Sequence, residues 1–134
     1  MKPETKFYAK VKKYFKEFSL IRLENLSVPG TPDLLVYNNN CNFFTIELKV
    51  TKTNKIKFSP HQIAWHKTHP KNTFIIVEAH GQRSSKTSSI FLYRGSRIME
   101  LDACGLKLEA TAVGLEACCL ELEACGLTLE TLIV

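Results

Sequence analysis

The sequence predicts an α/β domain in which helices flank a mixed central sheet, with core elements in the order αβββαβ. Three observations support this fold class: an amphipathic pattern near the N-terminus, two adjoining apolar runs typical of a hairpin, and a well-capped helix between strands. Residues 1–98 carry this pattern, whereas residues 99–134 form an acidic tail built on a seven-residue Leu/Glu/Cys repeat. We therefore expect one folded domain followed by a tail.

The first expected element is an amphipathic helix over residues 5–18, because apolar residues recur there at helical spacing. Residues 20–26 are expected to form a strand. This strand ends at residues 27–32, a segment rich in Pro, Gly, Ser and Thr that is typical of a turn. The apolar positions of the helix are Phe7, Val11, Tyr14, Phe15 and Phe18.

Two apolar runs at residues 33–37 and 43–50 are separated by the Asn-rich segment 38–42, a pattern typical of a β-hairpin. If the turn is centred on Asn40, directly opposed residues have numbers that sum to 80. The hairpin register then follows from the sequence.

In this register Asp33 faces Glu47, and side chains paired in this way have Cβ atoms about 5 Å apart. Alternation along the strand places Lys49 on the same face. The opposite face is uniformly apolar and is expected to belong to the core. The hairpin therefore concentrates two carboxylates and an ammonium group on one face of an otherwise apolar strand pair.

A second helix is expected from Ser59 to about His69. Ser59 is a good N-cap, Pro60 suits the first helical position, and Gln62 completes a capping box. Pro70 ends the helix. Buried strands are then expected at 73–79 and 89–93, joined by a polar loop.

From Leu101 the chain repeats every seven residues, and each repeat begins with Leu followed by an acid. This period favours a coiled coil. However, three glycines weaken a helix, and stretches of alternating Leu and Glu are typical of strands. The conformation of the tail stays open, as do a role in self-association, a regulatory role and no role at all.

The charge is unevenly distributed. Residues 1–98 contain 17 Lys and Arg against 6 Asp and Glu, a net charge of +11, whereas residues 99–134 contain one Lys against 7 acids. A domain this basic attracts polyanions, of which nucleic acid is the commonest in a cell, although a solvated basic surface has the same composition.

No apolar run is long enough to span a membrane, and the charged N-terminus lacks the apolar region of a secretory signal. We therefore expect a cytoplasmic protein with no membrane partner. Four of the five cysteines lie in the tail and no Cys-x-x-Cys pair occurs, which predicts reduced, unpaired thiols.

The charged face of the hairpin has a chemical consequence. Two carboxylates this close repel each other unless a cation lies between them, and oxygen ligands of this kind suit Mg²⁺ or Mn²⁺. Lys49 would neutralise one carboxylate or orient an attacking water. A plain cross-strand ion pair with Lys49 is the alternative, but it accounts for one acid and not for two.

Pro32-Asp33, thirteen further residues and then Glu47-Leu48-Lys49 resemble the PD-(D/E)xK nuclease signature. The segments 30–35, 44–49 and 59–66 are similar to phage-type and VRR-NUC-like members, whose core resembles that of Holliday-junction resolvases. The resemblance covers about residues 7–94. It implies a restriction-endonuclease-like core and Mg²⁺-dependent cleavage of DNA phosphodiester bonds.

By this resemblance, Asp33 and Glu47 would bind the metal, the backbone carbonyl of Leu48 would be a further ligand, and Lys49 would be the catalytic lysine. Gln62 would lie beside the site as a further catalytic residue, although the capping box explains it equally well.

Many relatives use one more acid before the Pro-Asp turn. Glu24 is the first candidate for this metal ligand, with Glu17 and Glu4 behind it. Each is also explained as an ordinary surface acid.

Phosphate contacts without sequence readout are expected from the first helix, the loop after the hairpin and the second helix. His61, His66 and His69 are alternatively a zinc site, but no Cys or acid nearby completes a tetrahedron, so surface histidines or one DNA contact are favoured. The expected DNA-binding residues are Lys10, Lys13, Lys52, Lys55, Lys57 and His66.

The sequence therefore predicts a Mg²⁺-dependent DNA endonuclease that is structure-selective or nicking. The alternative is a non-catalytic nucleic-acid-binding module on the same fold. Because resolvase-like relatives work as dimers, a homodimer is a further hypothesis.

Overall fold

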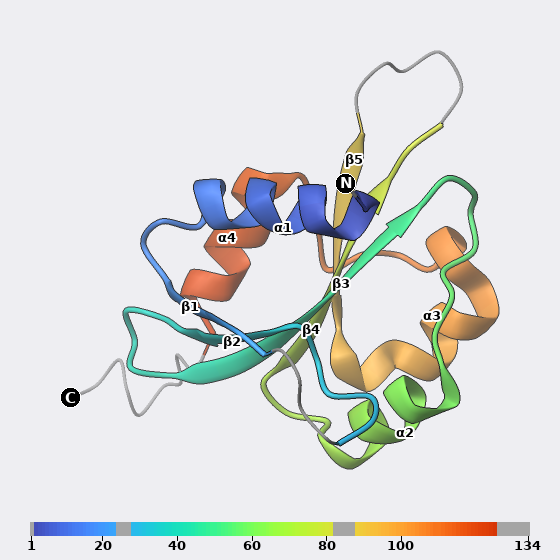
Figure 1. The fold of residues 1–134 in the computed structure, drawn as a ribbon, viewed down its shortest axis with the longest axis horizontal. Coiled ribbons are helices and arrows are strands. Elements are labelled where there is room, and N and C mark those ends of the chain that lie inside the picture. Colours follow the sequence, from blue (N-terminus) through green and yellow to red (C-terminus); the bar gives the residue numbers. More distant parts are fainter. Residues whose placement is uncertain (1, 24–27, 82–87, 126–134) are drawn as a thin grey trace.

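A computed structural model of the chain describes residues 2–23, 28–81 and 88–125. In these residues, six strands form one sheet in the order β1-β2-β3-β4-β5-β6 (Figure 1). Strands β3 and β4 are parallel and the other neighbouring pairs are antiparallel, so the predicted mixed α/β sheet is confirmed. The elements are α1 (Pro3–Tyr14), β1 (Ser19–Arg22), β2 (Leu34–Tyr37), β3 (Phe43–Thr51), α2 (Pro60–Thr68), β4 (Thr73–Ala79), β5 (Ser89–Arg94), the 3₁₀ turn η1 (Gly95–Arg97), α3 (Ile98–Cys104), η2 (Gly105–Lys107), β6 (Ala112–Val113) and α4 (Leu115–Glu123).

Helix α1 is shorter than predicted. It ends at Tyr14, and Phe15 leaves the helical conformation with φ −94° and ψ 48°. Phe15 and Phe18 are nevertheless buried, with their ring centroids 5.5 Å apart in an edge-to-face contact. The apolar spacing after Tyr14 therefore reflects burial in the core and not helix, and the predicted end at residue 18 is wrong.

The hairpin has the predicted register. Leu34 pairs with Ile46 and Tyr37 with Phe43, so paired residue numbers sum to 80 around Asn40. The side chain of Asn38 stabilises the turn, because its Oδ1 accepts hydrogen bonds from the backbone N–H groups of Asn40 and Asn42.

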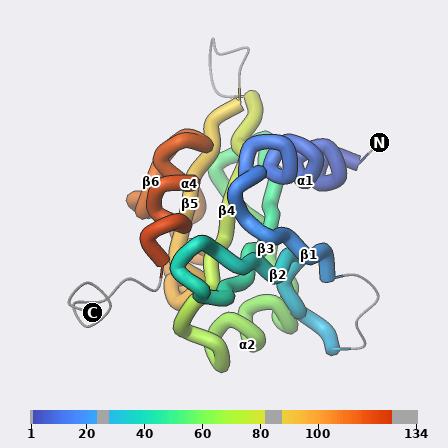
Figure 2. The backbone as a smooth tube through the Cα atoms, turned by 90° about the vertical axis from the view of Figure 1, so that its left-hand side faces the viewer, coloured from blue at the N-terminus to red at the C-terminus, as the bar shows by residue number. Residues whose placement is uncertain are grey.

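The sheet has a hydrophobic core on each face. Figure 2 shows α1 and α2 on opposite sides of the strands. Helices α1 and α4 cover one face, and α2 and α3 lie on the other (Figure 1). The first core contains Phe7, Val11, Leu34, Val36, Phe44, Ile46, Ile76, Leu92, Cys118 and Leu122, and the second contains Ile56, Ile75, Val77, Tyr93, Ile98 and Leu101.

The described part of the seven-residue repeat combines short helices with one short strand. β6 pairs with β5, and α4 packs on the same face of the sheet as α1. Leu101, Cys118 and Leu122 are fully buried, so residues on both sides of the sequence boundary at residue 98 share the two cores. The Asn38 side chain joins the hairpin to the end of α4 by donating to the carbonyl oxygens of Leu122 and Cys125, at 3.0 and 2.8 Å.

Within the described ranges, no helix has the length and apolar character needed to cross a membrane.

A buried acid fixes α1 against the sheet. Glu78 of β4 is 3% exposed and accepts hydrogen bonds from Lys10 of α1 and Ser88, while His80 Nε2 lies 2.7 Å from its Oε1. Burial raises the pKa of Glu78, but the hydrogen bonds from Lys10 and His80 outweigh it and hold the pKa below the ordinary value.

We expect Glu78→Gln to lower the free energy of unfolding by about 1–3 kcal/mol at pH 7, because the buried charged hydrogen bonds weaken. A group whose folded pKa is lowered contributes stability above its ordinary pKa, and this contribution is lost as the pH falls through the folded value. Urea unfolding of the two proteins should therefore converge below pH 4.5, the ordinary value. Glu100→Gln, which removes an exposed ion pair with Arg97, is the control and should change little. A difference that does not depend on pH would contradict the role of the Glu78 charge.

Candidate active site

The two acids of the hairpin lie together at the start of β2. Asp33 directly precedes β2, and the register continues to place it opposite Glu47 on β3. The backbone N–H of Leu48 donates to Asp33 Oδ2 at 2.8 Å, which fixes this carboxylate against the strand edge. Because the N–H and C=O of one strand residue point to the same side, the Leu48 carbonyl faces this edge too.

Gln62 links the other two charged groups. From the first turn of α2, its Oε1 accepts a hydrogen bond from Lys49 Nζ at 2.9 Å, and its Nε2 donates to Glu47 Oε1 at 2.9 Å. The capping box is also present, with Gln62 Oε1 accepting from Ser59 N at 3.0 Å and Ser59 Oγ accepting from Gln62 N at 3.1 Å. The two interpretations of Gln62 are therefore compatible, because one side chain caps α2 and holds Glu47 and Lys49.

A tight turn sets the distance between α2 and the hairpin. Gly30 has φ +84°, and a Cβ atom at this position would lie 2.2 Å from the His61 carbonyl oxygen. Only glycine permits this approach. The turn before Asp33 therefore packs directly on the N-terminus of α2, which brings Gln62 to the strand pair.

The electrostatics of the two acids favour a cation. Burial, and then the nearby negative charge of Asp33, raise the pKa of Glu47 to about 9, and burial raises the pKa of Asp33 as well. Glu47 is 3% exposed, and in its ionised form its buried Oε2 has no hydrogen-bond partner among the described residues, whereas a protonated Glu47 shares its proton with Asp33. A bound cation would both satisfy this oxygen and remove the repulsion, so the residues present fit a divalent metal.

A cavity of about 250 Å³ adjoins Asp33 and Leu48. Glu4 of α1 lines it, and its negative charge contributes to the raised pKa of both Asp33 and Glu47. Among the three candidates for a further acid, Glu4 is thus the one that lies beside the site. Glu24 lies outside the described residues, and the exposed Glu17 follows the end of α1.

The described residues contain no group of three or more His, Cys, Asp and Glu side chains that is arranged to hold a metal. This finding covers the three histidines and also the set of Glu4, Asp33 and Glu47, so it gives no support to a zinc site or to a site with three acidic ligands. His66 is 0% exposed and its Nδ1 lies 2.9 Å from the Gln62 carbonyl oxygen. The expected DNA contact of His66 is therefore wrong, because a fully buried ring cannot reach a phosphate.

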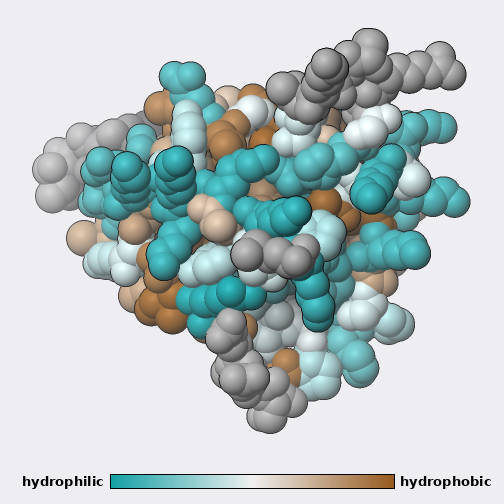
Figure 3. Space-filling view, turned by 45° about the horizontal axis from the view of Figure 1, so that its top comes forward, coloured by the Kyte–Doolittle hydropathy of each residue, from teal (hydrophilic) through white to brown (hydrophobic). Residues whose placement is uncertain are grey.

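Four of the five predicted phosphate-binding lysines are exposed and form no ion pair with another described residue: Lys13, Lys52, Lys55 and Lys57. Lys10 pairs with Glu78, but it also lines a cavity of about 450 Å³ together with Lys6, Lys52 and His80. The outer surface over α1 is predominantly hydrophilic (Figure 3). Lys6, Lys10 and Lys52 therefore lie beside the start of α1, whose Glu4 lines the cavity that adjoins Asp33. Lys55 lines a different cavity, next to α3.

Sequence reasoning missed Phe58. Its ring centroid lies 5.1 Å from Lys49 Nζ, so the ammonium group rests on an aromatic face while Gln62 holds it. The position of Phe58 directly before the N-cap is the pattern of a hydrophobic staple, which was a usable signal.

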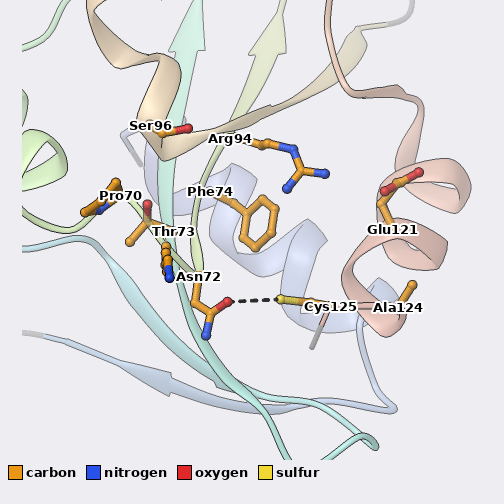
Figure 4. Close-up of a pocket in the computed structure, with 10 residues that line it drawn as sticks. Pro70, Asn72, Thr73, Phe74, Arg94, Ser96, Glu121, Ala124 and Cys125 are labelled. Carbon is orange, nitrogen blue, oxygen red and sulfur yellow. Dashed lines mark hydrogen bonds between the residues drawn. The ribbon is translucent and has the colours of Figure 1, made fainter. Parts of the chain in front are cut away.

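A separate cavity of about 360 Å³ lies between the start of β4, the end of β5 and α4 (Figure 4). Arg94 and Phe74 extend into it, and Cys125 contacts Asn72 at its edge. None of Asp33, Glu47, Lys49 and Gln62 lines this cavity, and we assign it no part in the candidate site.

No family model, curated protein or solved structure matches this chain.

We expect Glu47→Gln to stabilise the metal-free protein at alkaline pH. A carboxyl whose folded pKa is raised from 4.5 to about 9 binds more protons in the folded state, so its unfavourable contribution grows as the pH rises through this range. At pH 8 the variant should be more stable by a few kcal/mol, on the order expected for such a shift, and at pH 5 the two proteins should agree. Thermal unfolding in EDTA measures this difference. Equal stability at pH 8 would show that Glu47 does not carry an unfavourable buried charge.

Proposed function

We propose that this protein is a metal-dependent DNA endonuclease with a PD-(D/E)xK-type site on a restriction-endonuclease-like core. One observation carries the proposal: the hairpin register sets Asp33 against Glu47, and Gln62 joins Glu47 to Lys49 in the same site. An ordinary ion pair does not require a second buried carboxylate with an unpartnered oxygen.

The proposed ligands of Mg²⁺ or Mn²⁺ are the carboxylates of Asp33 and Glu47 and the carbonyl of Leu48, with Glu4 at the far side of the cavity. Two carboxylates are sufficient for Mg²⁺, which completes its coordination with waters and substrate phosphate oxygens. When bound, the metal supplies polarisation of the phosphate and a more acidic water.

Lys49 is the proposed catalytic lysine. Its ammonium group is held by Gln62 Oε1 and by the Phe58 ring, so it needs little reorganisation to stabilise negative charge at the phosphate or to orient the attacking water. Gln62 acts as a positioning residue, because it fixes both Glu47 and Lys49 and belongs to the rigid first turn of α2.

DNA is the proposed polyanion. The net charge of +11 on residues 1–98 and the exposed lysines around α1 support backbone contacts, which position a nucleic acid without reading its sequence. The described residues form one sheet with its flanking helices and no separate recognition domain, so selection by DNA structure or simple nicking is proposed over sequence-specific cutting. A homodimer, which would present two sites to two strands, remains part of this proposal.

The first test is cleavage of labelled DNAs in Mg²⁺, Mn²⁺ or EDTA, using supercoiled plasmid, linear duplex, single strand, flap and four-way junction. We expect metal-dependent cleavage that Glu47→Ala or Lys49→Met reduces by at least about 100-fold, because the first removes a proposed metal ligand and the second removes the positive charge at the reacting phosphate. Glu17→Gln, which alters an exposed acid outside the site, should cleave like the parent protein. Tight DNA binding with no cleavage in any metal would contradict the nuclease and favour the non-catalytic binding module.

We further expect Glu4→Gln to raise the Mg²⁺ concentration needed for half-maximal cleavage by roughly tenfold, the low end of the effect of removing an outer metal-site group. The reason is that Glu4 lines the cavity and adds negative charge next to Asp33, which would attract the Mg²⁺ ion. Titration of cleavage with Mg²⁺ gives the value, with Glu17→Gln as the matched control. An unchanged Mg²⁺ requirement would exclude Glu4 from the metal site.

A further inference from the structure

Among the described residues, one face of the sheet is only partly covered by helices. Helices α2 and α3 cover this face with the second core, whose strand residues come from β4 and β5. Over β1, β2 and the start of β3, the same face carries an apolar patch of four residues, in which Ile21 is 50% and Phe43 55% exposed. We call these residues the aromatic patch: Ile21, Leu35, Tyr37 and Phe43.

Two rings dominate the aromatic patch. Tyr37 and Phe43 are cross-strand partners, with centroids 4.5 Å apart and planes inclined by 43°. Aromatic faces exposed in this way bind nucleic-acid bases by stacking, and such stacking tolerates any base because every base has a π-face.

The aromatic patch is in line with the candidate active site. Because side chains alternate along a strand, Phe43, Glu47 and Lys49 of β3 project from the same face of the sheet. Phe43 and Glu47 are four residues apart, or about 13 Å at roughly 3.3 Å per residue. This is about four steps of a stacked nucleic-acid strand. Thr45 Oγ1 and Glu47 on β3 are themselves buried, whereas Leu35 and Tyr37 of β2 are half-buried. A strand whose phosphate is held between Asp33 and Glu47 would therefore reach the rings of the aromatic patch by passing over Leu35 of β2.

A cationic turn lies beside this path. Asn72 of the turn between α2 and β4 accepts a hydrogen bond from Thr45 N at 3.0 Å, and Thr45 separates Phe43 from Glu47 on the same face. The exposed Lys71 precedes Asn72 directly. The four residues of the aromatic patch are uncharged, and Lys71, which also lines the cavity beside α4, is an exposed cation of the turn that contacts Thr45.

We propose that Tyr37 and Phe43 stack unpaired bases of the DNA strand, within about four nucleotides of the phosphate held at the candidate active site. The inference rests on the proposed nuclease function and names its substrate class: DNA with a single-stranded segment on one side of the cut, as in flaps and splayed junctions. A second copy of this chain is the competing occupant of an exposed apolar face. The continuity with Glu47 and the charge of Lys71 favour the DNA strand.

Binding in EDTA tests this inference separately from cleavage. Fluorescence anisotropy with a labelled single strand, a splayed duplex and a blunt duplex gives the affinities. We expect Phe43→Leu, which keeps an apolar side chain but removes the ring, to weaken binding of the first two DNAs by about tenfold and to leave the duplex unchanged. Phe43→Trp should restore binding. Val113→Ala, at an apolar residue that is 58% exposed on the opposite edge strand, is the control and should have no effect.

A second measurement locates the contact. 2-Aminopurine is placed at successive positions of the splayed strand, and its quenching by the protein is measured in the parent protein and in Phe43→Leu. Quenching confined to a few positions beside the mapped cut, and lost in Phe43→Leu, would support the stacking platform.

Two outcomes would overturn the inference. Equal single-strand affinity of Phe43→Leu and the parent protein, with cleavage intact, would reject the platform and leave the nuclease standing. Loss of a dimer in Phe43→Leu by analytical ultracentrifugation, with DNA binding unchanged, would assign the aromatic patch to self-association instead. Failure of cleavage alone, with ring-dependent single-strand binding preserved, would reject the nuclease and retain the stacking surface.

Discussion

The candidate site depends on the register of the β2–β3 hairpin, which sets Asp33 and Glu47 against each other at the edge of a buried sheet. Because side chains alternate with a period of two, a slip of one residue would move Glu47 and Lys49 into the α1 side of the core and expose Ile46 and Leu48. Burial of the apolar residues of the hairpin therefore fixes the register that places Asp33 opposite Glu47. The asparagines of the turn add to this, since Asn38 fixes both the turn and the end of α4.

Two neighbouring carboxylates in a buried position are unfavourable by themselves, and the surrounding structure lowers this cost only in part. Gln62 gives Glu47 one hydrogen bond, and the Leu48 N–H gives Asp33 another, but Glu47 Oε2 stays unpartnered among the described residues. Such incomplete satisfaction is retained where it serves function, because a group that is fully paired within the protein has less to offer a ligand. The unfavourable burial of the Glu47 carboxylate is thus the feature that the proposed metal would relieve.

The sequence was most informative where structure is local or periodic. The Asn40 register and the α2 capping box follow from alternation and from residues three apart, and both are confirmed. The end of α1 was mispredicted because Phe18 is buried by tertiary packing and not by helical continuation. The position of Glu4 beside Asp33 arises from α1 crossing the sheet, which no local pattern encodes. His66 was misplaced because α2 has little contrast between its faces, so its buried side was not evident from spacing.

The two faces of the sheet differ in how completely helices cover them. The repeat segment completes the closed face, since Cys118 and Leu122 of α4 join the core that α1 begins. On the other face, α2 and α3 stop at β3, and this leaves the charged residues at the boundary between a covered and an uncovered half. On the covered side of such a boundary, the low dielectric of the core strengthens the interactions between charged groups. The uncovered side leaves room for a polymer to approach. A long polyanion suits this geometry better than a small molecule, because the uncovered part of the sheet is an open surface at Ile21 and Phe43 that continues from the buried Glu47, and not an enclosed pocket.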